Sequence, residues 1–391
     1  MAKKNRWDSS SSEDEDPNKN KRKRRAPTAK DTTIPTGADT DVPVNLKVSS
    51  TKLPPLHNPL SQGCRSVYDT YDRIARLSEG TYGIVWKAKD LVTQEIFALK
   101  QIKFEDQQKV MELQGFPVTA FREINVLMAL SSHENIVAVK EMVVGSALDK
   151  VFMVMEFFDN DLQQAMRQRK YPKVLRQAEL KGIMQQILRG MAYMHSKWFM
   201  HRDMKTSNIL VQKNTGRVAL CDFGLARSFT DPPGKNLTAL IVTLHYRAPE
   251  LLFGESRYTP AVDIWSIGCI FGELIMQDAL LQGQGELDQI DKIFTMLGPP
   301  TKENWPDFSK LPNAKIFRWR SSQKEMERIQ LHDIFPTNPP PHYEHTFLDG
   351  NGKDLLCRLL TLDPGKRISA TAALEHQYFK EGVMPINPNF L

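Results

Sequence analysis

Four polar residues stand in two short strings that suit the transfer of a phosphoryl group. Residues 201–208 read His-Arg-Asp-Met-Lys-Thr-Ser-Asn, and an Asp-Phe-Gly string begins at Asp222. In this pattern Asp203 would accept a hydroxyl proton, while Asn208 and Asp222 would hold Mg²⁺. Phosphoryl transfer depends on positioning and charge neutralisation, so Lys205 is placed to reach the transferred phosphate. The combined strings predict a phosphotransferase site.

A glycine-containing hairpin and a lysine would supply the phosphate contacts of a nucleotide. Residues 78–85 read Ser-Glu-Gly-Thr-Tyr-Gly-Ile-Val between two strand patterns, so their backbone N–H groups can approach phosphate oxygens. Ser78 replaces the first glycine of the full Gly-x-Gly-x-x-Gly pattern, which leaves a plain tight hairpin as the alternative. Lys100 ends the next strand and is expected to hold the α- and β-phosphates while pairing with Glu123 of the following helix.

An apolar run that ends in polar residues predicts the hinge of the nucleotide site. Residues 154–158 read Val-Met-Glu-Phe-Phe and lead into Asp-Asn-Asp at 159–161. The hinge backbone would pair with adenine and Asp161 would meet the ribose; without the flanking motifs, these residues are a core strand and a turn. The predicted nucleotide contacts are Leu77, Gly80, Thr81, Gly83, Val85, Ala98, Lys100, Glu156, Phe158, Asp161 and Leu210.

Composition places these motifs in a globular protein of more than one lobe. Of 391 residues, 41% are hydrophobic and 25% are charged. No apolar run reaches about 18 residues and the first residues are polar, so we expect a soluble, intracellular protein without a membrane span. The 4 cysteines are far apart, which argues against disulfides or a zinc site. Cys221 is interpreted as a small buried residue rather than a reactive thiol.

Residues 1–60 have the composition of a disordered arm. They contain one aromatic residue, Trp7, and twelve Lys/Arg against eight Asp/Glu. The run that begins at Lys19 and ends at Arg25 carries six positive charges, which favours binding to a nuclear import receptor over contact with nucleic acid; no aromatics interleave it for base stacking. Serines 9–12 precede four acidic residues and form either a phosphorylation site or a solvated tract.

The order of hydrophobic patterns predicts a strand-rich lobe followed by a helical lobe. Short alternating apolar runs after Tyr71 are typical of an antiparallel sheet, and residues 118–130 have helical spacing. Long amphipathic stretches such as 180–195 then dominate. We therefore expect an α+β fold. Its parts are a pre-domain segment at 61–70, a small lobe at 71–155, a hinge at 156–161, a large lobe at 162–379 and a tail at 380–391.

Together these motifs resemble those of the eukaryotic protein kinases over residues 71–379. Residues 115–123, Gly-Phe-Pro-Val-Thr-Ala-Phe-Arg-Glu, are similar to the cyclin-binding helix of the PITSLRE-type cyclin-dependent kinases. Gly-Cys-Arg-Ser-Val at 63–67, Val-Val-Gly-Ser at 143–146 and Thr-Ser at 206–207 agree with that subgroup.

The resemblance implies a bilobal protein-kinase fold and a cyclin-dependent serine/threonine kinase that uses ATP and Mg²⁺. It also implies an L-type cyclin bound through the helix around Pro117 and Glu123. The resemblance further implies a protein that is found in the nucleus, and partly in the cytoplasm, and that acts in transcription, pre-mRNA splicing and the cell cycle. Catalytic roles fall on Asp203, Lys205, Lys100, Glu123 and Thr243, and metal-binding roles on Asn208 and Asp222.

The same resemblance assigns regulatory residues to the activation segment at 222–250. Thr238 stands where these kinases are phosphorylated, and its phosphate would be received by Arg122, Arg202 and Arg227. Thr81 and Tyr82 resemble inhibitory phosphorylation sites, with ordinary hairpin residues as the alternative. Val242 and Arg247 would shape a pocket that favours Pro after the phosphorylated residue, because Pro leaves no N–H unpaired there. Substrates with Ser/Thr-Pro are therefore expected.

Three further expectations concern positions outside the chemistry. Glu250 should pair with Arg367, and Asp263 should brace the catalytic loop. His245 departs from the Trp of the family pattern, and the proline-rich stretch 316–345 is either a partner-specific insert or a loop.

Other functions remain as alternatives. A related cyclin-dependent kinase with a PISSLRE-like helix would differ mainly in its partner. A pseudokinase scaffold is disfavoured because the catalytic residues are all retained, and a mitogen-activated kinase because the activation loop lacks a Thr-x-Tyr string after Thr238.

Overall fold

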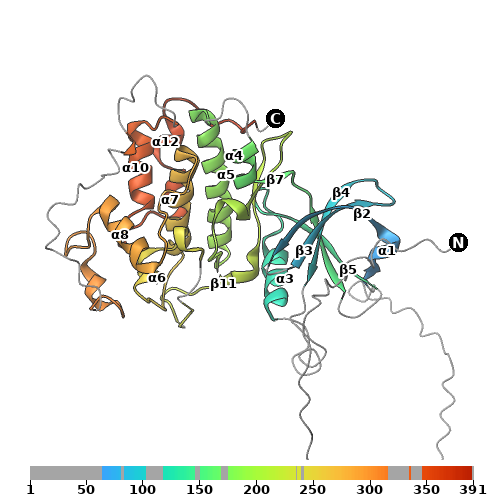
Figure 1. Cartoon of the computed structure of the whole chain (residues 1–391), viewed down its shortest axis with the longest axis horizontal. Coiled ribbons are helices and arrows are strands. Elements are labelled where there is room, and N and C mark those ends of the chain that lie inside the picture. Colours follow the sequence, from blue (N-terminus) through green and yellow to red (C-terminus); the bar gives the residue numbers. More distant parts are fainter. Residues whose placement is uncertain are drawn as a thin grey trace, which may run out of the picture.

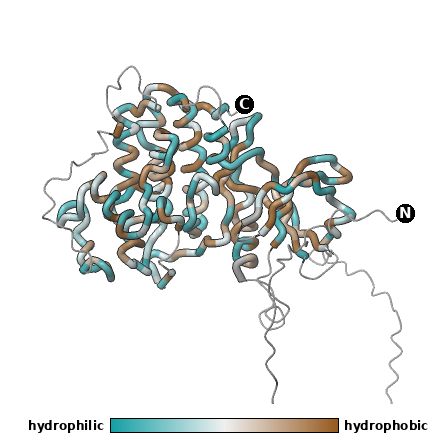
Figure 2. Tube along the Cα trace, viewed as in Figure 1, coloured by the Kyte–Doolittle hydropathy of each residue, from teal (hydrophilic) through white to brown (hydrophobic). Residues whose placement is uncertain are grey.

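The computed structural model describes residues 64–80, 83–102, 118–145, 150–168, 175–234, 236–238, 242–315, 334–335 and 346–389. They form a small strand-rich lobe and a larger helical lobe, which confirms the expected α+β, two-lobed fold (Figure 1). Hydrophobic and hydrophilic residues alternate along the elements of both lobes (Figure 2), as expected of elements that bury one face. The arm at 1–60, Thr81, Tyr82, Pro117 and the stretch 316–345 apart from 334–335 lie outside the described residues.

One six-stranded sheet forms the small lobe. Its strands run in the order β1-β5-β6-β4-β3-β2, and every neighbouring pair is antiparallel except β1 and β5, which are parallel. Side chains including Leu99, Phe152 and Val154 pack with Tyr71 into a small core. The strand bounds are β1 Arg65–Ser66, β2 Tyr71–Gly80, β3 Gly83–Asp90, β4 Ile96–Ile102, β5 Val139–Val144 and β6 Val151–Glu156.

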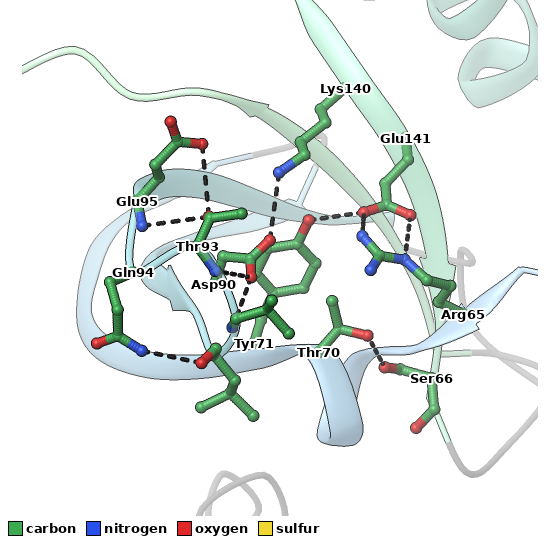
Figure 3. Close-up of polar contacts among 12 residues, drawn as sticks. Arg65, Ser66, Thr70, Tyr71, Asp90, Thr93, Gln94, Glu95, Lys140 and Glu141 are labelled. Atoms are coloured by element: carbon green, nitrogen blue, oxygen red, sulfur yellow. Dashed lines mark hydrogen bonds and ion pairs between the residues drawn. The ribbon is translucent and has the colours of Figure 1, made fainter.

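Strand β1 comes from the pre-domain segment and is fastened to the edge of this sheet. The guanidinium of Arg65 donates two hydrogen bonds to the carboxylate of Glu141, and the Tyr71 hydroxyl donates a third at 2.7 Å (Figure 3). Beside them, Lys140 lies 3.2 Å from the carboxylate of Asp90 at the end of β3 (Figure 3). Strand β1 and the short helix α1 (Val67–Thr70) thus extend the small lobe ahead of residue 71.

The longer helix of the small lobe, α3 (Val118–Leu130), has the bounds expected from its apolar spacing. Leu127 and Leu130 are buried, and the helix lies against the turn η3 (Phe223–Leu225) of the large lobe. Phe121 and Met128 instead remain 66% and 71% exposed. The helix therefore carries a second apolar surface that no described residue covers.

Helix α7 (Ala261–Met276) is the centre of the large lobe, since nearly all its side chains are buried. The α5 helix (Gln177–Ser196) begins three residues before the expected start, because the N–H of Arg176 donates to Glu179 in a capping arrangement. The other helices are α4 Leu162–Gln168, α6 Pro249–Leu252, α8 Glu286–Leu297, α10 Gly350–Leu359, α11 Ala370–Leu374 and α12 Gln377–Lys380. In the described part of the chain no helix combines the length and apolar character that a membrane span needs.

A buried ion pair ties α6 to the loop before α11. The two terminal nitrogens of Arg367 lie 2.8 and 2.9 Å from the carboxylate oxygens of Glu250. This fork confirms the pairing expected from the sequence, and it fixes the end of the activation segment to the large lobe.

Short strands hold the loops that carry the chemistry. Strands β7 (Asn160–Asp161), β9 (Ile209–Val211) and β10 (Val218–Leu220) form one sheet, and β8 (Phe199–Met200) pairs with β11 (Arg227–Ser228). The catalytic loop therefore runs between β8 and β9, and the Asp-Phe-Gly string between β10 and β11. Both loops start and end on paired strands, which limits their freedom.

Candidate active site

One buried carboxylate holds the catalytic loop. Asp263 of α7 accepts hydrogen bonds from the backbone N–H groups of His201, at 2.9 Å, and Arg202, at 2.8 Å. Arg202 has a φ of +70°, an uncommon value that these bonds help to maintain. Burial alone would raise the pKa of Asp263, but hydrogen bonds and positive charge, chiefly from His195, lower it. The expected bracing of the loop by Asp263 is confirmed.

Asp203 lies at the centre of a set of donors. The ammonium of Lys205 is 2.7 Å from its Oδ2, and the amide of Asn208 donates to the same oxygen at 3.1 Å. Thr243 donates to Oδ1 through both its N–H and its hydroxyl, each at 3.3 Å. Burial alone would raise the pKa of Asp203, but the hydrogen bond and charge of Lys205, the charge of His201 and the hydrogen bond from the Thr243 N–H together lower it. The site thus contains an ionised, oriented carboxylate.

A second group of charges forms where the two lobes meet. The ammonium of Lys100 on β4 lies 2.5 Å from Glu123 of α3 and 3.6 Å from Asp222. Burial would lower the pKa of Lys100, but the two carboxylates together raise it, so the lysine remains a cation. The structure therefore shows the pairing of Lys100 with Glu123 and brings Asp222 beside it.

The donor set around Asp222 fits a metal ion that is also bound by phosphate. Its Oδ1 is buried and accepts no hydrogen bond from any described residue, and its φ of +63° turns it out of regular structure. Asn208 uses its amide nitrogen on Asp203, which leaves its oxygen for a ligand. Within the described ranges no cluster of three His, Cys, Asp or Glu residues could hold a metal unaided. Mg²⁺ commonly takes one or two carboxylates together with phosphate oxygens, so these residues fit it.

The β2–β3 hairpin stands over this group. Gly80 pairs with Gly83, and Val85 of β3 lies opposite Lys100 of β4. A Cβ atom on Gly83 would come within 2.0 Å of the carbonyl oxygen of Gln101, so the close approach of these strands requires glycine. Around the hairpin, Leu77 of β2 is 44% exposed, Ala98 of β4 is buried and Leu210 of β9 is half-buried.

The hinge follows β6. Phe158 is buried, and Asp161 accepts a hydrogen bond from the N–H of Gln164 at 2.7 Å. Burial raises the pKa of Asp161. Arg217, just before β10, holds the Glu156 side chain in a two-point ion pair, so the Glu156 carboxylate is not available to a nucleotide. Sequence patterns miss Arg217 because a single arginine in a turn gives no signal of its distant partner.

Three arginines from separate elements lie close enough to affect one another. Burial, together with the charge of Arg122 on α3, lowers the pKa of Arg202, and burial and both neighbouring charges lower that of Arg227 on β11. The Nε of Arg202 is buried with no hydrogen-bond partner among the described residues. Its guanidinium faces the ring of Tyr258 at 5.6 Å, and the Tyr258 hydroxyl donates to the carbonyl oxygen of Thr238. The cluster therefore concentrates positive charge, and Tyr258 connects it to the exposed Thr238.

A cavity of about 720 Å³ opens beside the catalytic loop. Lys205, Thr243 and His245 line it, together with Tyr246 and Glu273 at its buried side. The space next to Asp203 is thus large enough for side chains of a protein substrate.

The turn before this cavity has an unusual backbone. Val242 has a φ of +66°, and its carbonyl oxygen accepts hydrogen bonds from Arg247 at 3.0 and 3.3 Å. Arg247 is also 2.6 Å from Glu286 of α8. The carbonyl of Val242 is therefore already engaged within the protein.

Comparisons with known proteins agree with this geometry. Residues 71–379 match the protein kinase domain family. The chain is 46% identical over 333 residues to cyclin-dependent kinase 11 of Dictyostelium discoideum, covering 85% of this chain and 86% of that protein. It is 43% identical over 357 residues to cyclin-dependent kinase G-2 of Oryza sativa subsp. indica, covering 91% of this chain and 48% of the relative. It is also 43% identical over 338 residues to human cyclin-dependent kinase 11B, covering 86% and 39%.

These relatives differ in how much of their own length the chain covers. The chain spans about half the length of the rice relatives and less of the human one, whereas it spans most of the Dictyostelium protein. The residues that match the protein kinase domain family, 71–379, include the loop at 201–208 and helix α3. The chain belongs to the protein kinase family and, within it, to the cyclin-dependent kinases of the kinase 11 (PITSLRE) and kinase G type.

Proposed function

We propose that this chain is a cyclin-dependent serine/threonine kinase that transfers the γ-phosphate of ATP to a protein hydroxyl. The observation that carries the proposal is the set of contacts around Asp203. Lys205 keeps the carboxylate ionised, while Asn208 and Thr243 aim it. A carboxylate in that state can orient a substrate hydroxyl and accept its proton.

The other site residues would position the nucleotide. Lys100, held by Glu123, would bind the α- and β-phosphates, and Asp222 with Asn208 would hold Mg²⁺. When bound, the metal neutralises charge on the phosphates. Lys205 lies within reach of both Asp203 and Thr243, where it would meet the phosphate in transfer. The backbone at Glu156 and Phe158 would pair with adenine.

We assign a preference for Ser/Thr-Pro substrates to the turn at Val242. Because its carbonyl oxygen already accepts two hydrogen bonds from Arg247, that oxygen is not available to the N–H of the residue that follows the phosphorylated hydroxyl. An N–H buried without an acceptor is costly, and Pro has none.

The partner and the place of action are proposed from the surface and from the relatives. The exposed Phe121 and Met128 of α3 offer apolar contacts to a cyclin, for which we propose the L type. Similarity to cyclin-dependent kinase 11, together with the basic run from Lys19 to Arg25, supports import into the nucleus and roles in transcription, pre-mRNA splicing and the cell cycle. Phosphorylation of Thr238 would activate the enzyme, and modification of Thr81 or Tyr82 would inhibit it.

The experiment compares wild type with Asp203→Asn, each purified with an L-type cyclin. Radioactive ATP is offered with a Ser-Pro peptide and with a Ser-Ala peptide. We expect wild type to label the Ser-Pro peptide preferentially and Asp203→Asn to be about 10²- to 10⁴-fold slower. Equal labelling by both proteins would refute the proposed role of Asp203. Cyclin binding without labelling by wild type would instead identify a scaffold.

A further inference from the structure

Arg217 joins the large lobe to the hinge by three hydrogen bonds. Its two terminal nitrogens lie 2.7 and 3.0 Å from the two carboxylate oxygens of Glu156, the last residue of β6. Its Nε donates to the carbonyl oxygen of Glu134 at 2.7 Å, and its guanidinium carbon lies 5.2 Å from the Phe158 ring centroid. One side chain therefore contacts both hinge residues assigned to adenine and the loop that follows α3.

Glu156 is held from a second side as well. Its N–H donates to the carbonyl of Ala138 at 3.0 Å, and its Oε1 accepts from the N–H of Ala138 at 2.9 Å. Both its backbone and its side chain thus have fixed partners within the small lobe, and Arg217 adds the link to the large lobe. A change at Arg217 would leave Glu156 held by Ala138 alone and would remove the link from the hinge to the large lobe.

The turn that presents Arg217 is itself fixed. Gly216 has a φ of +65°, and a Cβ atom there would come within 2.2 Å of the carbonyl oxygen of Pro388 in the C-terminal tail. The Gly216 carbonyl accepts from Gln186 of α5, and the carbonyl of Thr215 accepts from Asn387 of the tail. The turn that carries Arg217 is therefore fixed by hydrogen bonds from helix α5 and from the C-terminal tail.

We propose that Arg217 is a positioning residue for nucleotide binding, which fixes the hinge backbone at Glu156 and Phe158 in the orientation that pairs with adenine. It does so by gripping Glu156 from the large lobe, and it does not touch the nucleotide. The inference rests on the proposed ATP site. It predicts an effect on the affinity for ATP rather than on the transfer step, because Asp203, Lys205 and Thr243 are held by contacts that do not include Arg217.

Kinetics of the full chain with its cyclin test this role. We expect Arg217→Ala to raise the KM for ATP about three- to tenfold, with kcat and the KM for peptide changed less than about twofold. Arg189→Ala is the matched control, since Arg189 is exposed and makes only a long ion pair with Glu134, at 4.0 Å. The KM of this variant for ATP should not change. An unchanged KM for ATP in Arg217→Ala, or a loss of thermal stability and kcat alone, would overturn the inference.

A charge swap separates positioning from a general structural role. The single variants Arg217→Glu and Glu156→Arg should each raise the KM for ATP, and the double variant should recover part of the loss, because it restores the ion pair but not the hydrogen bonds with Ala138 and Glu134. No recovery in the double variant would contradict a specific pair. Binding of a fluorescent ADP analogue is measured in parallel: wild type that binds ADP but transfers no phosphate refutes the proposed function, whereas unaltered ADP affinity in Arg217→Ala refutes only this inference.

Discussion

Asp203 takes its orientation from three donors of different kinds, and the loop beneath it takes its shape from a single carboxylate. Lys205, Asn208 and Thr243 each reach Asp203 directly. Asp263 contacts none of the reacting groups, yet it binds the two N–H groups just before Asp203. Asp263 therefore shapes the loop that presents Asp203, and its charge links the stability of that loop to pH.

Asp263→Asn should lower stability in a pH-dependent way. The pKa of Asp263 is lowered in the folded protein from its ordinary value of 3.8. A lowered pKa means that the ionised group stabilises the fold above the unfolded-state value, and that this contribution is lost as pH falls through the folded-state pKa. We expect Asp263→Asn to cost about 2–5 kcal/mol in unfolding free energy at pH 7. The difference from wild type should shrink below about pH 4.

Urea unfolding at neutral and acidic pH measures this difference. Asp307→Asn serves as control, because Asp307 is an exposed residue paired with Lys310 on the surface and should change stability by less than about 1 kcal/mol. A penalty for Asp263→Asn that is the same at both pH values would show that the charge of Asp263 does not stabilise the loop.

At the scale of elements, helix α3 has one buried surface and one exposed apolar surface. Its buried leucines lie among the core residues of the molecule, and Glu123 reaches Lys100, while Phe121 and Met128 face outward. A helix that lies between Lys100 and an exposed apolar surface can transmit binding at that surface to the site around Lys100. The surface should therefore govern partner affinity.

Phe121→Ser should weaken cyclin binding about tenfold or more without destabilising the isolated chain, because an exposed aromatic contributes little to the fold and much to an interface. Affinity for an L-type cyclin is measured by calorimetry, with thermal unfolding in parallel. Val92→Ser is the control, since Val92 is also exposed and apolar but lies in the turn between β3 and β4. Equal affinities of Phe121→Ser and wild type would place the cyclin elsewhere.

Some elements could be predicted from the sequence and others could not. Helix α3 could be predicted because its apolar residues recur at helical spacing, and the catalytic loop because residues 201–208 form a specific string. Strand β1 could not, because its pairing with β5 depends on Arg65 meeting Glu141, which is distant in sequence. The role of Arg217 could not be predicted either, because its partner Glu156 is also distant in sequence. Contacts between isolated polar residues far apart in the chain leave no periodic trace.

At the scale of the whole molecule, three arginines from the two lobes lie close enough for their charges to affect one another, and a bound anion would compensate those charges. Arg122 comes from the small lobe, Arg202 from the loop at 201–208 and Arg227 from strand β11 within the activation segment. Their like charges repel one another, and a phosphate bound among them would offset that repulsion. The exposed Thr238 is linked to this cluster through Tyr258.

Phosphorylation of Thr238 should therefore stabilise and activate the chain together. We expect the phosphorylated form to melt about 3–6 °C higher and to work about tenfold faster or more, because the phosphate forms several charge-assisted hydrogen bonds that order the activation segment. Arg122→Gln should remove about half of the thermal shift, since it takes away the contact from the small lobe. Calorimetry of both forms measures the shift, with Arg257→Gln, an exposed arginine after α6, as control. The same shift in Arg122→Gln as in wild type would mean that the phosphate orders the large lobe alone.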